Sequence, residues 1–280
     1  MNSKIEFYNN LKKIITNNIL NIPEKKIDEM YDTWLETKDI IDVKKNFVYS
    51  DKFIHNNQNI PQKVTLKGID LPTWFGCYNN KKIVVLGIDP RRNENHFLRD
   101  KANIENDVIV GTPYAFHEKE TRESWCASYW TFINGLVEMK NFVYCTSIFK
   151  TYYYNTSSET RSHKEKCFVE KPNHLDILNK ELELIKPDLI IAFGGVPYKN
   201  ITKKNCPISQ DILKTKTEIQ LKYSDVDVYV MMNLSKATRG KNMEAFFKAN
   251  EISTDSINVE DRVECAEKYI ELLKNKNIIS

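Results

Sequence analysis

The sequence predicts an α/β fold: a three-layer α/β/α sandwich around a central, mainly parallel four-stranded sheet, preceded by an N-terminal helical region. Four short runs rich in β-branched and aromatic residues are apolar through their length, at 83–87, 142–147, 189–194 and 226–233. Segments with apolar residues at helical spacing separate these runs. Apolar strands that alternate with helices are typical of a parallel sheet that is covered on both faces.

The first 70 residues are predicted to be helical. Apolar residues recur there at helical spacing in two stretches: Tyr8, Leu11 and Ile15, then Ile27, Met30 and Trp34. A polar stretch around Pro61 is typical of a linker. We therefore expect a helical region over residues 1–70 and one α/β domain over residues 71–280.

Three further helices are predicted within that domain. The first has an apolar face made of Trp125, Tyr129, Phe132, Ile133 and Leu136. The second runs from about residue 175 to 185 and is closed by Pro187, and the last spans residues 263–273. These helices are expected to cover the sheet.

Composition limits the possible classes of protein. With 280 residues, 41% of them apolar, the chain can form a large core, and a net charge of +3 permits a nucleic-acid partner without requiring one. Its six cysteines form no CxxC pair, which argues against a zinc site and a disulfide framework. No signal-peptide or membrane-spanning pattern is found, so we expect a cytoplasmic protein with no membrane partner, and favour a monomer.

Polar residues follow the ends of the four predicted strands. In open parallel sheets, ligands bind beyond the carboxyl ends of the strands. An acid, hydroxyls, glycines and an amide are found there: Asp89 with Arg91 and Arg92, Thr146 and Ser147, Gly194 and Gly195, then Asn233 and Ser235. The sequence therefore predicts a site for a polar ligand at this edge.

Five segments in order resemble the uracil-DNA glycosylase superfamily. They are GIDP at 87–90, GTPY at 111–114, VYCTSIFK at 143–150, ELIKPDLIIAFGG at 183–195 and NLS at 233–235. The third and fourth are most similar to the thermophile-type branch. That branch binds an iron–sulfur cluster through four cysteines, including an N-terminal pair that this sequence lacks. We therefore expect no metal and no cofactor.

The resemblance implies a role for each matching residue. Asp89 would stabilise the developing sugar cation and orient the attacking water, and Asn233 would donate hydrogen bonds to the departing base. Tyr114, or Phe116 in its place, would stack on the extracted base. Contacts to DNA are expected from Arg92 and from the loop after the fourth strand, through Ser235, Lys236, Thr238, Arg239 and Lys241.

Three positions depart from the family pattern. Arg91 replaces a tyrosine that bars thymine, and Ser147, or Thr146 in the other possible register, replaces a base-reading asparagine. A hydroxyl cannot supply the paired donor and acceptor of an amide. Leu234 replaces a proline, which predicts a looser loop. The substrate is therefore expected to be a damaged or modified base, not necessarily uracil.

Simpler interpretations remain open for the same residues. Asp89 can cap a turn, Arg91 and Arg92 can form a solvated pair, and Asn233 can bridge backbone groups of its own loop. Tyr114 and Phe116 can be core aromatics. For the whole protein, the alternative to a DNA glycosylase is a non-catalytic nucleic-acid-binding member of the same fold. An unrelated α/β hydrolase or nucleotide-binding protein is disfavoured because the sequence has no phosphate-binding glycine loop and no nucleophile elbow.

Overall fold

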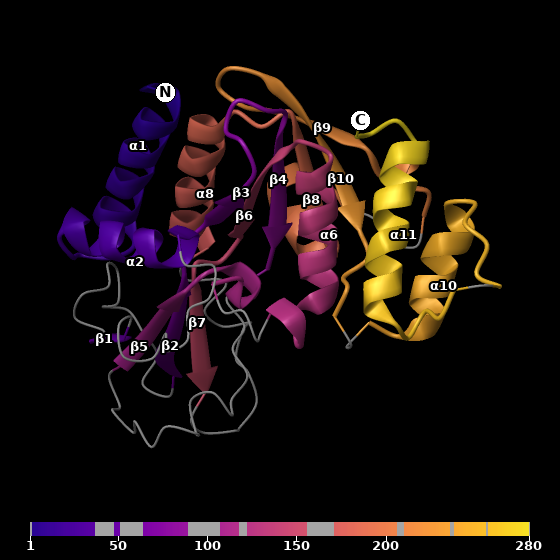
Figure 1. Cartoon of the computed structure of the whole chain (residues 1–280), viewed down its shortest axis with the longest axis horizontal. Helices are drawn as coiled ribbons and strands as arrows, with labels where there is room; N and C mark the ends of the chain where they lie inside the picture. The colour runs from indigo at the N-terminus through magenta and orange to yellow at the C-terminus, as the bar shows by residue number, and fades with distance from the viewer. Residues whose placement is uncertain are drawn as a thin grey trace. The chain divides into compact units, whose positions relative to one another are not determined.

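The computed structural model describes residues 2–36, 48–50, 64–88, 107–117, 122–155, 171–205, 210–235, 238–255 and 257–279. The chain forms two compact units whose segments alternate along the sequence (Figure 1). The first unit comprises Met1–Pro72, Asp89–Lys119 and Ser147–Ile185, and the second comprises Thr73–Ile88, Glu120–Thr146 and Lys186–Ser280. The boundary predicted from the sequence, between a helical region over residues 1–70 and an α/β domain over residues 71–280, stays a prediction. It does not coincide with the division into these two units.

The second unit is built on a six-stranded sheet. In spatial order its strands are β3 (Thr73–Phe75), β6 (Phe142–Ser147), β4 (Lys82–Gly87), β8 (Leu189–Phe193), β10 (Asp225–Met231) and β9 (Thr217–Gln220). The pairs β4–β8 and β8–β10 are parallel, whereas the edge pairs β3–β6 and β9–β10 are antiparallel. The four predicted strands are therefore neighbours at the centre of this sheet, and the predicted α/β class is confirmed.

The two edge strands were not predicted. β3 has three residues and β9 has four, and the burial of β9 alternates between buried and exposed positions. An edge strand is covered by fewer neighbours than a central one, so it does not need a continuous apolar run. The criterion that found the central strands therefore could not find these two.

In the part of the second unit that the structure describes, this sheet is accompanied by the helices α6 (Ala127–Glu138), α9 (Gly195–Thr202), α10 (Gly240–Ala249) and α11 (Arg262–Asn275). Helices α6 and α11 lie side by side, where a side chain at Gly135 would come within 2.8 Å of Ile270 Cγ1. The ring of Phe132 on α6 packs against Phe193 of β8 and Tyr269 of α11, with centroids 5.2 and 6.4 Å apart. This contact joins the two helices to the sheet.

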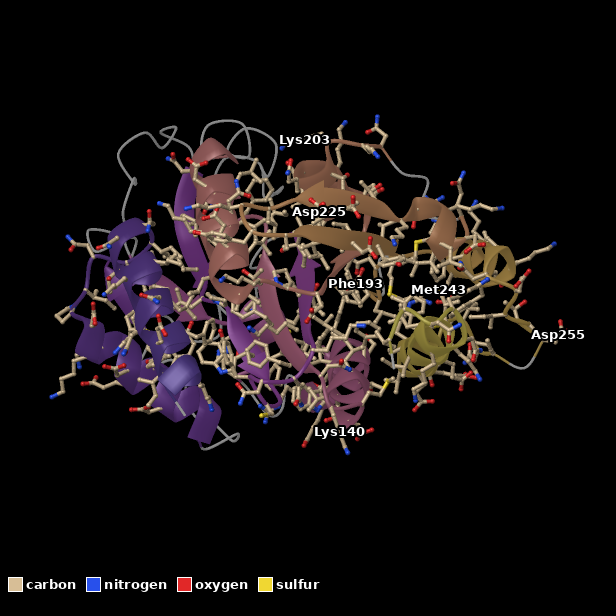
Figure 2. All side chains as sticks on the ribbon, turned by 90° about the horizontal axis from the view of Figure 1, so that it is seen from above. Lys140, Phe193, Lys203, Asp225, Met243 and Asp255 are labelled. Carbon is tan, nitrogen blue, oxygen red and sulfur yellow. The ribbon has the colours of Figure 1, made fainter. Side chains whose placement is uncertain are left out.

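The side chains of the second unit separate by polarity. Phe193 is 1% exposed and lies in its interior, whereas Lys140 and Asp255 are exposed at its periphery (Figure 2). The core around Phe193 is therefore apolar, in agreement with the burial of every residue of β8.

The first unit contains the N-terminal helices and a second sheet. Helices α1 (Asn2–Asn18) and α2 (Glu24–Glu36) are present, as predicted, and α1 also packs on α8 (Lys171–Ile185). The sheet has the order β1 (Val48–Ser50), β5 (Asp107–Gly111), β2 (Val64–Asp70) and β7 (Thr151–Asn155). In it, β2 and β5 are parallel, and the other pairs are antiparallel.

The helical prediction for residues 1–70 needs a correction, because β1 and β2 are strands. Val64, Leu66 and Ile69 alternate imperfectly with polar residues in β2, and its pairing with β7 shifts register between Leu66 and Gly68. That irregularity hides the two-residue period that identifies a strand.

A buried ion pair lies within the first unit. Lys150 Nζ and Glu181 Oε2 are 2.8 Å apart, with side chains 1% and 0% exposed. The backbone N–H of Lys150 donates to His174 Nδ1 over 3.1 Å, and its carbonyl oxygen accepts from the N–H of Asp70 over 2.9 Å. The segment after β6 is thereby tied to α8 and to β2.

Candidate active site

The carboxyl ends of β4, β8 and β10 meet at one edge of the six-stranded sheet, because these strands are parallel. Leu86, Ala192 and Val230 lie in one row across them. With strand spacings of about 4.8 Å, the outer members of that row are roughly 10 Å apart. Along the chain, Asp89 follows Leu86 by three residues and Asn233 follows Val230 by three. Asp89 itself lies outside the described residues.

Asn233 is half-buried, and its carboxamide orientation is fixed by two donors. Its Oδ1 accepts from the backbone N–H of Ser235 over 2.9 Å and from the hydroxyl of Tyr129 on α6. Because a backbone N–H can only donate, the atom it contacts must be the oxygen. Nδ2 makes no hydrogen bond to any residue that the structure describes, so both its hydrogens can be donated to a ligand.

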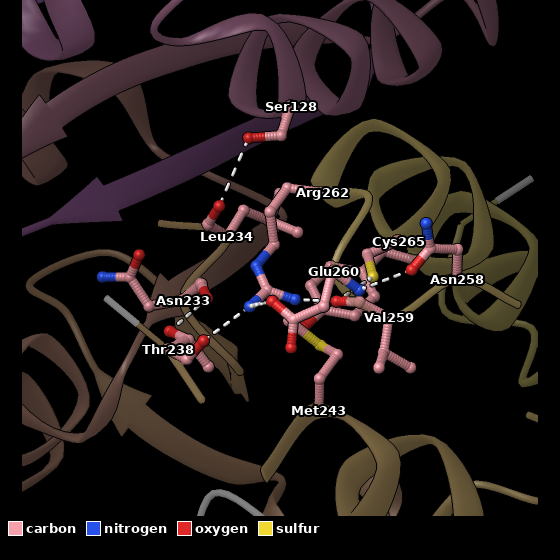
Figure 3. A network of polar contacts seen from close by, with 11 residues as sticks. Ser128, Asn233, Leu234, Thr238, Met243, Asn258, Val259, Glu260, Arg262 and Cys265 are labelled. Atoms are coloured by element: carbon pink, nitrogen blue, oxygen red, sulfur yellow. Dashed lines mark hydrogen bonds and ion pairs between the residues drawn. The ribbon is translucent and has the colours of Figure 1, made fainter. Parts of the chain in front are cut away.

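The loop that follows Asn233 is held by side chains from several elements (Figure 3). Ser128 Oγ donates to the carbonyl oxygen of Leu234 over 3.3 Å, and Thr238 Oγ1 donates to that of Asn233 over 2.7 Å. Just before the loop, the carbonyl of Met232 accepts from the Tyr269 hydroxyl over 3.1 Å. The side chain of Leu234 is 1% exposed. Leu234 is therefore part of the core, and the looser loop expected from the loss of proline stays a prediction.

Arg262 supports the same loop from the first turn of α11. Its guanidinium donates to the carbonyl oxygen of Thr238 over 2.5 Å and to that of Val259, and Glu260 Oε2 lies 3.6 Å away (Figure 3). The arginine is only 6% exposed. A buried guanidinium is costly unless its donors are satisfied. The two carbonyls accept from its terminal nitrogens, whereas the buried Nε has no hydrogen-bond partner among the described residues.

Neither Tyr129 nor Arg262 was identified as a site residue from the sequence. Tyr129 was assigned to the apolar face of a helix, which it does occupy, and only its hydroxyl reaches the loop. Arg262 opens a helix among other charged residues, and nothing in its local sequence distinguishes it from a solvated cation. Either residue could have been identified only by knowing which distant segments of the chain are neighbours in space.

The residues predicted to contact DNA differ in their exposure and in whether their polar groups already form hydrogen bonds within the protein. Arg239 and Lys241 are exposed, and Ser235 is half-buried. Thr238 is half-buried and already donates its hydroxyl proton to Asn233, the same proton that a phosphate contact would require. Thr238 therefore shapes the loop. Lys236, Arg91 and Arg92 lie outside the described residues.

In the first unit, Tyr114 and Phe116 form a pair with ring centroids 5.3 Å apart. Tyr114 has φ +57 and Ala115 has φ +52, a left-handed conformation that is uncommon outside glycine. The turn is closed by Thr112, whose N–H donates to Nδ1 of the buried His117 over 3.1 Å. Phe116 is 1% exposed, whereas Tyr114 is half-buried and retains surface for a ligand.

The hydroxyl residues at the end of β6 are both buried. Thr146 is 0% exposed and Ser147 is 3% exposed. Their burial fits a dry recognition surface, and it fits ordinary core packing equally well. Their roles stay predictions.

Trp125 does not lie where the sequence pattern placed it. The pattern put it on the buried face of a helix, but its side chain is 72% exposed. Helix α6 begins at Ala127 with Cys126 as its N-cap, so Trp125 precedes the helix and does not share its periodicity. The other four residues of that pattern, Tyr129, Phe132, Ile133 and Leu136, are buried as predicted.

Within the described ranges, no group of three or more His, Cys, Asp or Glu side chains is arranged to hold a metal ion. Cys77, Cys126, Cys145 and Cys265 are free thiols there, and burial raises the pKa of the Cys265 thiol to about 11. Of the helices that the structure describes, none is both long and apolar enough to cross a bilayer.

The fold, together with the loop that follows Asn233 after β10, defines an α/β protein whose candidate site lies beyond the carboxyl ends of parallel strands. The Uracil DNA glycosylase superfamily matches residues 73–252, and the chain belongs to this superfamily. No curated protein sequence matches the chain. The matched segment contains Asn233 and ends before α11, so Arg262 lies beyond it.

Proposed function

We propose that this protein is a DNA glycosylase that hydrolyses the bond between a flipped-out damaged or modified base and its deoxyribose. Membership of the Uracil DNA glycosylase superfamily supports a glycosylase-type function on DNA. The observation that carries the specific proposal is the register of the parallel strands. Asp89 and Asn233 follow, by equal numbers of residues, two positions in one row of the sheet.

The proposed chemistry divides between these two residues. Cleavage leaves positive charge on the sugar and negative charge on the departing base. Asp89, as a carboxylate, stabilises the sugar cation and orients the water that adds to it. Asn233 donates from Nδ2 to an oxygen of the base, and its orientation before binding is what makes such a donor effective. Removing one pre-organised donor of this kind typically costs about 3 kcal/mol of barrier.

The base is held by residues whose roles come from the family pattern. Tyr114 stacks on its face, and its greater exposure favours it over Phe116. Ser147, Thr146 and Arg91 contact its edge. Arg91 takes the place of the tyrosine that bars the methyl group of thymine, so the proposed substrate is a bulkier or more polar base than uracil.

The DNA backbone is held beside this site. Arg92, Ser235, Lys236, Arg239 and Lys241 bind phosphates, and Arg239 and Lys241 have the exposure that this requires. The proposed enzyme acts as a cytoplasmic monomer and needs no cofactor for the hydrolysis.

The test is a strand-cleavage assay. Duplex and single-stranded oligonucleotides carrying uracil, hypoxanthine, alkylated, hydroxymethylated or glycosylated bases are incubated with the protein and treated with alkali, which breaks the strand at abasic sites. We expect cleavage for at least one base, and its loss in Asp89→Asn and Asn233→Ala. Tyr198→Phe is a matched control, because Tyr198 makes its hydrogen bonds to Thr215 and Thr217, remote in sequence from the loop. DNA binding without an abasic product for any base would instead indicate the non-catalytic alternative.

A further inference from the structure

Trp125 is the most exposed large apolar side chain in the part of the chain that the structure describes. It is 72% exposed, compared with 61% for Tyr223 and 58% for Ile5. A tryptophan ring offers the largest apolar surface of any side chain, so an exposed tryptophan does not contribute the stabilising free energy that burying this surface would give. The exposed ring offers a flat apolar face on which an aromatic ligand can stack.

The position of Trp125 places it near the candidate active site. Two residues of α6 form hydrogen bonds to the loop after β10: Ser128 to Leu234 and Tyr129 to Asn233. Trp125 precedes Ser128 by three residues, so their Cα atoms are at most about 11 Å apart. The exposed ring therefore stands at the end of α6 that adjoins Asn233.

Trp125 is not required by the core of the second unit. The aromatic residues after it are packed: Tyr129 and Phe132 on Phe193, with centroids 5.3 and 5.2 Å apart. Trp130 packs on Phe75 at 5.1 Å, and the Arg122 guanidinium lies 5.1 Å from its ring. The helix is thus fully engaged without Trp125.

The loop contacted by α6 also carries the exposed Arg239, and the exposed Lys241 follows it in the first turn of α10. An exposed aromatic ring together with cations is the combination that binds unpaired nucleic acid, by stacking on bases and neutralising phosphates. A protein partner would be expected to need a wider apolar patch than one ring. The chemistry therefore favours a nucleobase as the occupant.

We propose that Trp125 stacks on an unpaired nucleobase of bound DNA, next to the base held in the site. Removing a base from a duplex leaves its neighbour without a stacking partner, and a tryptophan ring can take that place. The inference takes DNA as the ligand from the proposed function, but it does not depend on catalysis.

The experiment measures tryptophan fluorescence and DNA affinity in the full chain. The probes are labelled single-stranded oligo-dT and a labelled duplex with one stable abasic-site analogue. We expect both probes to quench wild-type emission and to protect it from acrylamide. In Trp125→Phe this change should disappear while affinity stays within about threefold, because phenylalanine still stacks.

Trp125→Ala should weaken binding of both probes by about tenfold or more, since a base–aromatic stack contributes about 1–3 kcal/mol. Ile5→Ala is the control, because it removes another exposed apolar side chain, on α1 of the first unit, and should leave affinity unchanged. Wild-type affinity in Trp125→Ala, or an equal loss in Ile5→Ala, would overturn the inference.

The two proposals fail separately. If no base is excised but Trp125→Ala weakens DNA binding, the stacking role stands and the glycosylase function falls. If excision occurs and Trp125→Ala binds DNA normally, the glycosylase function stands and the stacking role falls. Absence of DNA binding by the wild type would overturn both.

Discussion

The hydroxyl of Tyr129 donates a hydrogen bond to the carboxamide oxygen of Asn233. The two residues are 104 positions apart, one on α6 and the other just after β10. The contact holds Oδ1 on the protein side and leaves Nδ2 for a ligand. It also withdraws electron density from the amide, which strengthens Nδ2 as a donor. Tyr129 is therefore a positioning residue for the proposed reaction.

Substitution Tyr129→Phe tests that relationship. It removes the hydroxyl and keeps the ring, which packs on Phe193. We expect kcat to fall about tenfold with little change in KM, since one hydrogen bond contributes about 1–1.5 kcal/mol. Single-turnover and steady-state kinetics, on DNA that carries the excised base, measure the effects on kcat and KM separately.

Two further variants make this test specific. Tyr198→Phe also removes a buried tyrosine hydroxyl and should leave kcat unchanged. In Asn233→Ala, adding Tyr129→Phe should have no further effect on kcat, because the group it positions is absent. Additive losses would show that Tyr129 acts in some other way.

Arg262→Met should destabilise the loop and the protein together. The substitution leaves the carbonyls of Thr238 and Val259 without their charged donor. We expect the free energy of unfolding to fall by about 3 kcal/mol, measured by urea denaturation. Arg262→Lys should restore only part of the loss, because an ammonium cannot reach two carbonyls in the fixed geometry of a guanidinium.

Lys268 on the same helix provides the comparison for Arg262. It pairs with Glu271 at the surface, over 2.9 Å. Because exposed ion pairs contribute little, Lys268→Met should change the free energy of unfolding by less than about 1 kcal/mol. An equal effect of Lys268→Met and Arg262→Met would contradict the role given to Arg262.

Lys150→Met should be strongly destabilising, because it removes the buried ammonium group that pairs with the buried carboxylate of Glu181. Burial lowers the pKa of the Lys150 ammonium, and Glu181 opposes that shift. Breaking such a pair costs about 3–5 kcal/mol, which calorimetry or denaturant titration would detect.

The double variant Lys150→Met, Glu181→Leu separates charge from packing. Replacing both partners by apolar residues removes the uncompensated charge, so most of the lost stability should return. If the double variant is as unstable as Lys150→Met, then the shape of the pair matters more than its charge.

Asp28 should contribute a dependence of stability on pH. Burial acts to raise the pKa of its carboxyl, but hydrogen bonds from Lys12 and Tyr8 outweigh it and lower the pKa below its ordinary value of 3.8. A carboxyl with a lowered folded-state pKa stabilises the protein above the unfolded-state value, and this contribution is lost as pH falls through the folded-state value.

Asp28→Asn is the test of that dependence. The difference in unfolding free energy between wild type and Asp28→Asn should be largest near neutral pH and should shrink once the pH falls below 3.8. Parallel pH curves for wild type and Asp28→Asn would refute the coupling.

The sequence by itself determined the centre of the fold and the family. The central strands β4, β6 and β8 and the second half of β10 are buried on both faces, and burial on both faces is a local property that appears as a continuous apolar run in the chain. The residues that follow those runs, Asn233 among them, could be located because parallel strands place their carboxyl ends at one edge. Membership of the superfamily was read from the same segments.

Tertiary structure alone decided how that edge is completed. The hydrogen bonds of Tyr129 and Arg262 join segments that are distant along the chain, and local sequence carries no record of them. Trp125 has the spacing of a buried residue and is exposed, since the helix begins two residues later at Ala127. The short edge strands and the second sheet depend likewise on which neighbours happen to cover them. Periodicity reports what a segment can bury, whereas its neighbours in space determine what is buried.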